Sequence, residues 1–109
     1  MYARHPWKLR GVQDKLQKAL GKRVRELRLR AGYSQEAFAD HCGVHRTFMG
    51  TIERGETNLS LQNLARLAAG FGITLSKLLS GVERQAEKLG RGRVAPDQVL
   101  PPDSRPRRG

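Results

Sequence analysis

Residues 34–55 read SQEAFADHCGVHRTFMGTIERG, and their spacing decides the fold. Ser34 is a good helix N-cap, because its side-chain oxygen can accept a hydrogen bond from a free N–H group of the first turn. Gly43 predicts the end of that helix, since glycine adopts the left-handed conformation without a side-chain clash. A second helix is predicted at once, over about 46–54. The segment should therefore form two short helices that cross over a tight turn.

Apolar residues recur at helical spacing in both halves of this segment and predict its buried side. They are Phe38, Ala39, Cys42, Val44, Met49 and Ile52. Ala39 falls where the two helices come closest, so a larger side chain there would separate them. The same spacing leaves a polar set on the exposed side of the second helix, namely Arg46, Thr47, Gly50 and Thr51.

Three further helices are predicted around this pair. The first precedes it and carries an apolar stripe, which is Leu16, Leu20, Val24 and Leu27. Ser60 should cap a fourth helix, and Thr74 should cap a fifth. The stripe of the fifth helix is Leu75, Leu78, Leu79 and Val82. Gly81 is expected at least to weaken that last helix.

The predicted fold is an all-α domain of five helices over residues 13–82, flanked by two flexible ends. Residues 1–12 show no apolar periodicity, and Pro6 and Gly11 discourage a helix, so an extended N-terminal arm is expected. Residues 83–109 are basic and contain four prolines, with no periodic apolar face beyond Gly90. This segment is expected to be a mostly disordered tail.

Composition narrows the class of partner. Lys and Arg total 21 against 10 Asp and Glu, and the net charge is +11. This excess favours a polyanionic partner, and charge alone does not choose between nucleic acid and an anionic membrane surface. The single cysteine excludes an intrachain disulfide and fits a reducing compartment. Since no apolar run approaches the roughly 20 residues that span a bilayer, and no secretory signal opens the chain, we expect a cytoplasmic protein without membrane association.

Metal and catalytic chemistry find little support. His41, Cys42 and His45 form a candidate metal cluster, but Cys42 is on the apolar side and Gly43 ends the helix that would align the histidines. A zinc site also normally needs four ligands. There is no phosphate-binding glycine loop and no nucleophile with a base at recognisable spacing. We therefore expect no metal, no cofactor and no enzymatic activity.

Residues 34–55 resemble the helix-turn-helix of phage Cro and repressor proteins, known as the Xre type. Small Ala39, Gly43 in the turn, and the inward Met49 and Ile52 match that pattern. The resemblance extends over roughly residues 20–80, which is more than half of the chain. It implies a lambda-repressor-like domain whose second motif helix enters the major groove of double-stranded DNA.

The resemblance also implies site residues. The expected base-reading residues are Arg46, Thr47, Gly50 and Thr51, and Arg46 should donate two hydrogen bonds to a guanine. The expected phosphate-binding residues are Gln35, His45, Arg54, Asn58 and Ser60. Two alternatives stay open: His45 either caps the helix or reaches a phosphate, and Phe48 lies near the sugar-phosphate surface or packs on the fourth helix. Arg28 and Glu53 are expected to form a structural pair that joins the first helix to the reading helix.

A domain this small cannot cover the whole apolar stripe of its last helix. Leu75, Leu79 and Val82 are therefore expected at the interface of a two-fold dimer, whose reading helices would lie about 34 Å apart on a palindromic operator. The expected function is sequence-specific transcriptional regulation. Repression is the default, and activation is equally available to this architecture. Controllers of restriction-modification systems and antitoxins are the candidate subtypes, and in the antitoxin alternative the tail binds a toxin while DNA binding regulates the operon.

Overall fold

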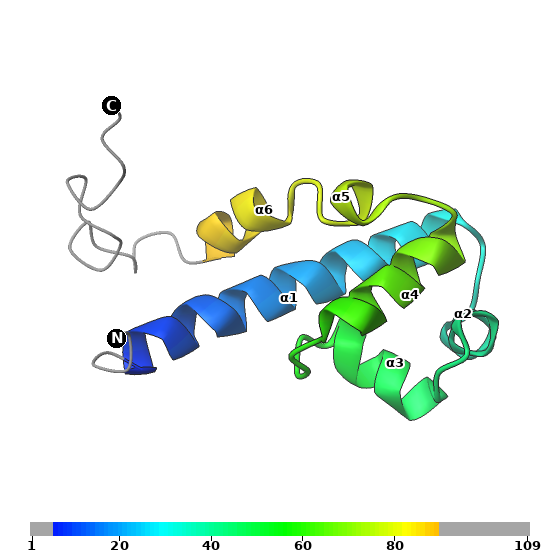
Figure 1. The fold of residues 1–109 in the computed structure, drawn as a ribbon, viewed down its shortest axis with the longest axis horizontal. Helices are drawn as coiled ribbons and strands as arrows, with labels where there is room; N and C mark the ends of the chain where they lie inside the picture. The colour runs from blue at the N-terminus through cyan, green and yellow to red at the C-terminus, as the bar shows by residue number, and fades with distance from the viewer. Residues whose placement is uncertain (1–5, 90–109) are drawn as a thin grey trace.

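The computed structural model describes residues 6–89, with side chains from residue 14 onward. The helices are α1 (Pro6–Arg30), α2 (Gln35–Cys42), α3 (Arg46–Glu53), α4 (Leu61–Phe71), α5 (Leu75–Leu78) and α6 (Val82–Leu89). No strand occurs between residues 6 and 89, so the expected all-α fold is confirmed. The long helix α1 contacts both α3 and α6, while α4 packs against α2 and α5 (Figure 1).

The predicted helix pair is present with the predicted boundary signals. Ser34 accepts a hydrogen bond of 3.0 Å from the backbone N–H of Ala37, and its backbone is extended as an N-cap requires. Gly43 follows α2 with φ +75°, and its N–H donates to the Asp40 carbonyl at 3.1 Å. This left-handed residue turns the chain, so that α3 begins three residues later and packs against α2.

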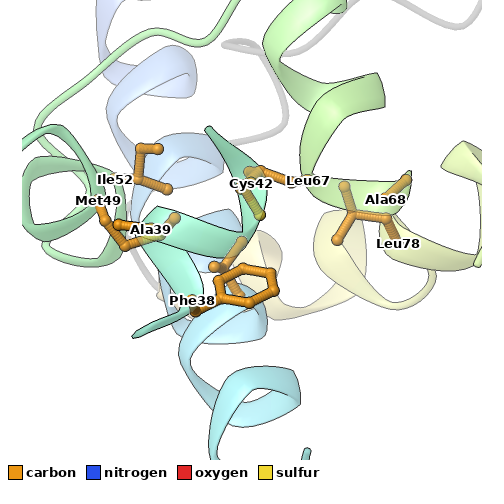
Figure 2. Packing of buried hydrophobic residues seen from close by; sticks show 9 residues of the cluster. Phe38, Ala39, Cys42, Met49, Ile52, Leu67, Ala68 and Leu78 are labelled. Atoms are coloured by element: carbon orange, nitrogen blue, oxygen red, sulfur yellow. The ribbon is translucent and has the colours of Figure 1, made fainter. Parts of the chain in front are cut away.

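The core lies where the first five helices meet (Figure 2). Its buried side chains are Val24, Phe38, Ala39, Cys42, Met49, Ile52, Leu67, Ala68 and Leu78. Phe38 is central, since its ring stacks on that of Phe71 with centroids 4.3 Å apart. Burying a large apolar side chain contributes about 1.5–3 kcal/mol, and this cluster therefore supplies most of the driving force that holds α2 and α3 on the rest of the domain.

A close approach of α1 to the end of α3 depends on Gly21. A Cβ at this position would lie 2.6 Å from the backbone carbonyl oxygen of Glu53, and closer still to that of Ile52. Real Cβ atoms do not come this near to backbone oxygen, so any larger residue would push the two helices apart. Gly21 thus allows α1 to support α3 directly.

The N-terminal boundary differs from the expectation. α1 begins at Pro6, so the arm predicted for residues 1–12 is wrong for 6–12, and residues 1–5 lie outside the described part. Proline suits the first turn of a helix, because its missing N–H would have no intrahelical partner there. Gly11 costs an interior helical position about 1 kcal/mol, which a helix of 25 residues tolerates.

The C-terminal boundary differs too. The predicted fifth helix is present as two segments, because Gly81 has φ +81° and turns the chain between α5 and α6. α6 then lies along α1, where Val82 and Ala86 pack on Ala19. The folded region therefore runs to Leu89, and only residues 90–109 of the predicted tail lie outside the described part.

Arg23 of α1 binds the C-terminal end of α5. Its Nη2 and Nε donate to the carbonyl oxygens of Lys77 and Leu78 at 2.7 and 3.0 Å. Carbonyls at a helix end lack the usual intrahelical donors, and the guanidinium supplies a hydrogen bond to both, in addition to the Ser80 N–H that the Lys77 carbonyl accepts at 3.1 Å. Its positive charge also suits that end of the helix. Arg23 is therefore committed to the fold.

Candidate nucleic-acid interface

The outward side of α3 borders a hollow that α2 closes on one side. Its volume is about 460 Å³, and it is lined by Gln35, Glu36, Arg46, Thr47, Gly50 and Arg54. The opposite side of α3 carries Met49 and Ile52, which are buried in the core. Every residue lining the hollow is polar or glycine, so this surface suits a polar, water-covered partner.

A buried ion pair holds the C-terminal end of α3 in place. Arg28 donates from Nε and Nη2 to the two carboxylate oxygens of Glu53, at 2.6 and 2.9 Å, and these side chains are 8% and 5% exposed. Arg28 Nη1 also donates to the carbonyl of Tyr33 at 2.9 Å. The hydrogen bond to Glu53 raises the pKa of Arg28 above its ordinary value, although burial alone would lower it. The expected structural pair is thus present and joins α1 to α3.

Gln35 extends this network to the hollow. Its Nε2 donates to Glu53 Oε1 at 3.1 Å, which fixes the amide at the start of α2. Its Oε1 would lie 3.6 Å from a Cβ on Gly50, so the amide oxygen is directed toward the reading face of α3. Arg28, Glu53 and Gln35 therefore connect the buried support of α3 to its exposed surface.

Three of the expected base-reading residues meet at the hollow. Arg46 is 66% exposed, and its Nη1 lies 3.5 Å from Oε1 of the exposed Glu36. Thr47, one residue further along α3, is also exposed. Gly50 lies one helical turn after Arg46 and is covered by the Arg54 guanidinium, whose Nη1 would lie 3.1 Å from an added Cβ. The missing side chain at Gly50 gives the hollow its depth.

The fourth expected reader is placed differently. Thr51 is half-buried and does not line the hollow. Its hydroxyl donates to the Phe48 carbonyl at 2.7 Å and accepts from the hydroxyl of Thr57 at 2.7 Å. Because its one hydroxyl proton is donated to the Phe48 carbonyl, Thr51 can donate to a base only by giving up that bond, whereas its oxygen keeps one lone pair that can still accept. Its methyl group takes part in neither hydrogen bond.

Of the five expected phosphate-binding residues, Gln35 and Arg54 line the hollow. Arg54 lines it and forms an ion pair with Glu56 at 3.1 Å. His45 caps α3, where its Nδ1 accepts from the Thr47 N–H at 3.0 Å. That acceptor role places the proton of the neutral ring on Nε2, which is left as a donor. One of the two open readings of His45, the helix cap, is therefore observed.

Two other members of that set lie away from the hollow. Ser60 caps α4, since its Oγ accepts from the Asn63 N–H at 3.1 Å, and its hydroxyl proton is free to donate elsewhere. Asn58 is exposed but lies at the edge of a second, apolar groove. The half-buried ring of Phe48 packs against the core cluster, and both alternatives for its exposed part stay open.

The second groove contains the part of the last stripe that one chain does not cover. It has a volume of about 340 Å³ and is lined by Leu16, Gln17, Leu20, Asn58, Leu59, Leu64, Leu79, Val82 and Glu83. Leu79 is 37% exposed, and Leu75 is half-buried against the core. Val82 is only 6% exposed, because α6 folds back on α1 and covers it. Val82 still lines the groove, so its expected place in a dimer interface stays a prediction.

The candidate metal cluster does not assemble within the described residues. His41 contacts the Gly70 carbonyl at 3.0 Å and stacks on Tyr33, while His45 caps the next helix. Cys42 is buried in the core, and desolvation raises the pKa of its thiol. Among residues 6–89 no three His, Cys, Asp or Glu side chains group as metal ligands, and no helix has the length and apolar character needed to cross a membrane.

Sequence reasoning missed Glu36 and Glu56, the carboxylates paired with the two arginines of the hollow. Glu36 occupies the first turn of α2, where an acidic residue is ordinarily explained by the helix dipole. Glu56 follows α3 in a loop. Their spacing from Arg46 and Arg54 carries no periodic signal, so only the crossing of the helices and the path of the loop bring these charges together.

Comparison with known proteins identifies the family of this chain. Residues 19–79 match the family model described as a helix-turn-helix domain. The control protein C.MunI of a Mycoplasma species is 42% identical over 66 residues, which cover 60% of this chain and 89% of the relative. The control protein C.BamHI of Bacillus amyloliquefaciens is 40% identical over 60 residues, or 54% of this chain and 74% of the relative.

A solved structure supports the same family assignment. The crystal structure of the restriction-modification controller protein C.AhdI from Aeromonas hydrophila superimposes with a TM-score of 0.55 and 40% identity, covering 57% of this chain and 94% of that one. The matched family region contains the helix pair, the Arg28–Glu53 pair and all residues that line the polar hollow. The chain therefore belongs to the Xre-type helix-turn-helix family of DNA-binding transcriptional regulators.

Proposed function

We propose that this regulator binds a palindromic operator as a homodimer and reads it with the outward side of α3. The observation that carries the proposal is the polar hollow around Arg46, Thr47 and Gly50, which lies opposite the buried side of the same helix. The N-terminal end of α3 is the exposed end, and in helix-turn-helix proteins that end points at the base edges of the major groove.

Arg46 is the proposed main reader. Its guanidinium is exposed at the first residue of α3, and a bidentate contact to O6 and N7 of guanine discriminates by about 1–3 kcal/mol against another base. Thr47 would add a hydroxyl and a methyl beside it. Gly50 would let the helix backbone come close to a base pair once the Arg54 guanidinium that covers it moves aside. Thr51 would contribute its methyl group to a thymine methyl.

The proposed phosphate contacts set the position of α3 in the groove. Gln35 is held by Glu53 at the start of α2, where free N–H groups and the helix dipole favour an anion. Arg54, the Nε2 of His45 and the hydroxyl of Ser60 supply further donors around α3 and α4. Asn58 would donate from the loop between them. These contacts should carry affinity with little dependence on sequence.

We place the dimer interface at the apolar groove and at Leu79. A second copy would cover this leucine and the edge of Leu75, and two-fold symmetry would bring the same residues from both chains together. Leu79→Glu should therefore yield a monomer in sedimentation velocity and weaken operator binding while the helical content is kept. A wild-type chain that sediments as a monomer, both free and on DNA, would contradict this assignment.

The proposed biological role is that of a controller. Two of the relatives are named control proteins, and C.AhdI is described as a controller of restriction-modification. We propose the same class of role here, with repression or activation decided by where the operator lies relative to a promoter. These relatives favour a controller over the antitoxin alternative, whose toxin-binding tail was expected over residues 83–109, and of these only 83–89 belong to the described part.

Selection of bound fragments from random DNA duplexes tests this proposal. The expected consensus is an inverted repeat with half-site centres about one helical turn apart and a guanine in each half-site for Arg46. A consensus without two-fold symmetry would contradict the dimer. If no consensus is recovered, and the affinity changes with salt concentration but not with DNA sequence, sequence-specific recognition is contradicted.

A further inference from the structure

Both arginines that line the hollow are paired with a glutamate. Arg46 Nη1 lies 3.5 Å from Glu36 Oε1, and Arg54 Nε lies 3.1 Å from Glu56 Oε2. The two pairs are not equivalent, because Glu36 itself lines the hollow and Glu56 does not. One carboxylate thus faces the surface on which DNA is proposed to lie. A negative charge there is unexpected, since it opposes binding to a polyanion.

The position of Glu36 lets its charge affect which group of the DNA Arg46 binds. A guanidinium has five N–H donors, and the contact with Glu36 engages only Nη1, so Nη2 and Nε remain for a second partner. A guanine edge offers two acceptors without a net charge, whereas a phosphate brings a full negative charge toward the carboxylate. Glu36 therefore penalises a phosphate at Arg46 and tolerates a base edge.

We propose that Glu36 is a specificity-determining positioning residue, which directs Arg46 to a guanine and disfavours its binding to the DNA backbone. The inference rests on the proposed function, because it presupposes that Arg46 reads a base. Glu36 belongs to α2 and Arg46 to α3, so the pair also joins the two motif helices at the hollow. Arg54 differs, since its partner Glu56 lies outside the hollow.

The test compares Glu36→Gln with Glu56→Gln in the full chain. Each variant removes one exposed carboxylate beside one arginine of the hollow, so the change in net charge is the same. Dissociation constants are measured over a range of salt concentrations for the selected operator and for a scrambled duplex of equal length and composition. Circular dichroism establishes that both variants remain folded.

Glu36→Gln should tighten binding to the scrambled duplex by about two- to fivefold, a size typical of exposed charge pairs. Binding to the operator should not improve, so the ratio of the two affinities should fall. Selection with this variant should also show a weaker preference at the guanine assigned to Arg46. Glu56→Gln should tighten binding to both duplexes equally and leave the consensus unchanged.

The inference is overturned if Glu36→Gln and Glu56→Gln have the same effect on both duplexes, because the charge would then act only through long-range repulsion. It is also overturned if Glu36→Gln leaves the affinity ratio and the guanine preference unaltered. Failure of the proposed function looks different, since the wild-type chain would then bind the two duplexes equally before any substitution is made.

Discussion

The two sides of α3 differ in how firmly the rest of the chain holds them. The inner side buries Met49 and Ile52, ends in the Arg28–Glu53 pair and lies against the backbone of α1 at Gly21. The outer side presents Arg46, whose one ion pair is exposed. A helix of eight residues is not stable alone, so the inner contacts must specify its position. The outer residues are then free to vary with the DNA sequence to be read.

The largest expected effect on the free energy of unfolding comes from a substitution on the inner side of α3. Glu53→Ala would leave the buried Arg28 guanidinium without its carboxylate and should lower the free energy of unfolding by about 3–5 kcal/mol. Equilibrium denaturation in urea measures this loss. The matched control is Glu56→Ala, which removes an exposed carboxylate from Arg54 and should cost about 0–1 kcal/mol. Equal losses in the two variants would contradict the structural role of the buried pair.

A smaller loss is expected where α1 touches α3. Gly21→Ala would place a Cβ 2.6 Å from the Glu53 backbone oxygen, and the helices would have to separate. Overpacking of this kind costs about 1–3 kcal/mol, which exceeds the roughly 1 kcal/mol that alanine gains over glycine as a helix former. Thermal denaturation should show a lower Tm. A Tm equal to or above that of the wild type would show that α1 does not approach α3 so closely.

The smallest effect on folding is expected on the outer side. Gly50→Ala also replaces a glycine inside a helix, but its Cβ would meet the far end of the Arg54 side chain, which can move away. Stability should stay constant or rise by up to about 1 kcal/mol. Operator affinity should fall, because the methyl group partly fills the hollow. Retained affinity in a DNA-binding titration would show that the depth of the hollow is not used.

The parts of this fold that could be predicted depend on local signals. Ser34 and Gly43 each determine a helix boundary through their own backbone and side chain, so the sequence predicts α2 and α3 to within a residue. The Arg28–Glu53 pair, whose members are 25 residues apart, came only from the family resemblance. The start of α1 was missed because Pro6 and Gly11 are poor helix formers, and cooperative extension of a long helix outweighs that local preference.

Other features depend on tertiary contacts that a sequence does not display. Gly81 indicates a break, but not that α6 folds back and buries Val82 against α1. Thr51 is on the expected side of α3, yet its hydroxyl is engaged by Thr57 from the following loop. Glu36 reaches Arg46 only because α2 and α3 pack against each other. The sequence therefore predicts which residues lie at the candidate site better than it predicts the hydrogen bonds that each of them makes.

Arg46→Ala tests the central claim most directly, because it changes the outer side of α3 and leaves the inner side intact. Its unfolding free energy should equal that of the wild type within about 0.5 kcal/mol, as for surface substitutions in general. Binding to the selected operator should weaken by about 1–3 kcal/mol, and the preference for guanine at one base pair of each half-site should disappear. A loss of affinity with an unchanged consensus, or a loss of stability that accounts for the weaker binding, would contradict the assignment of Arg46 as the base reader.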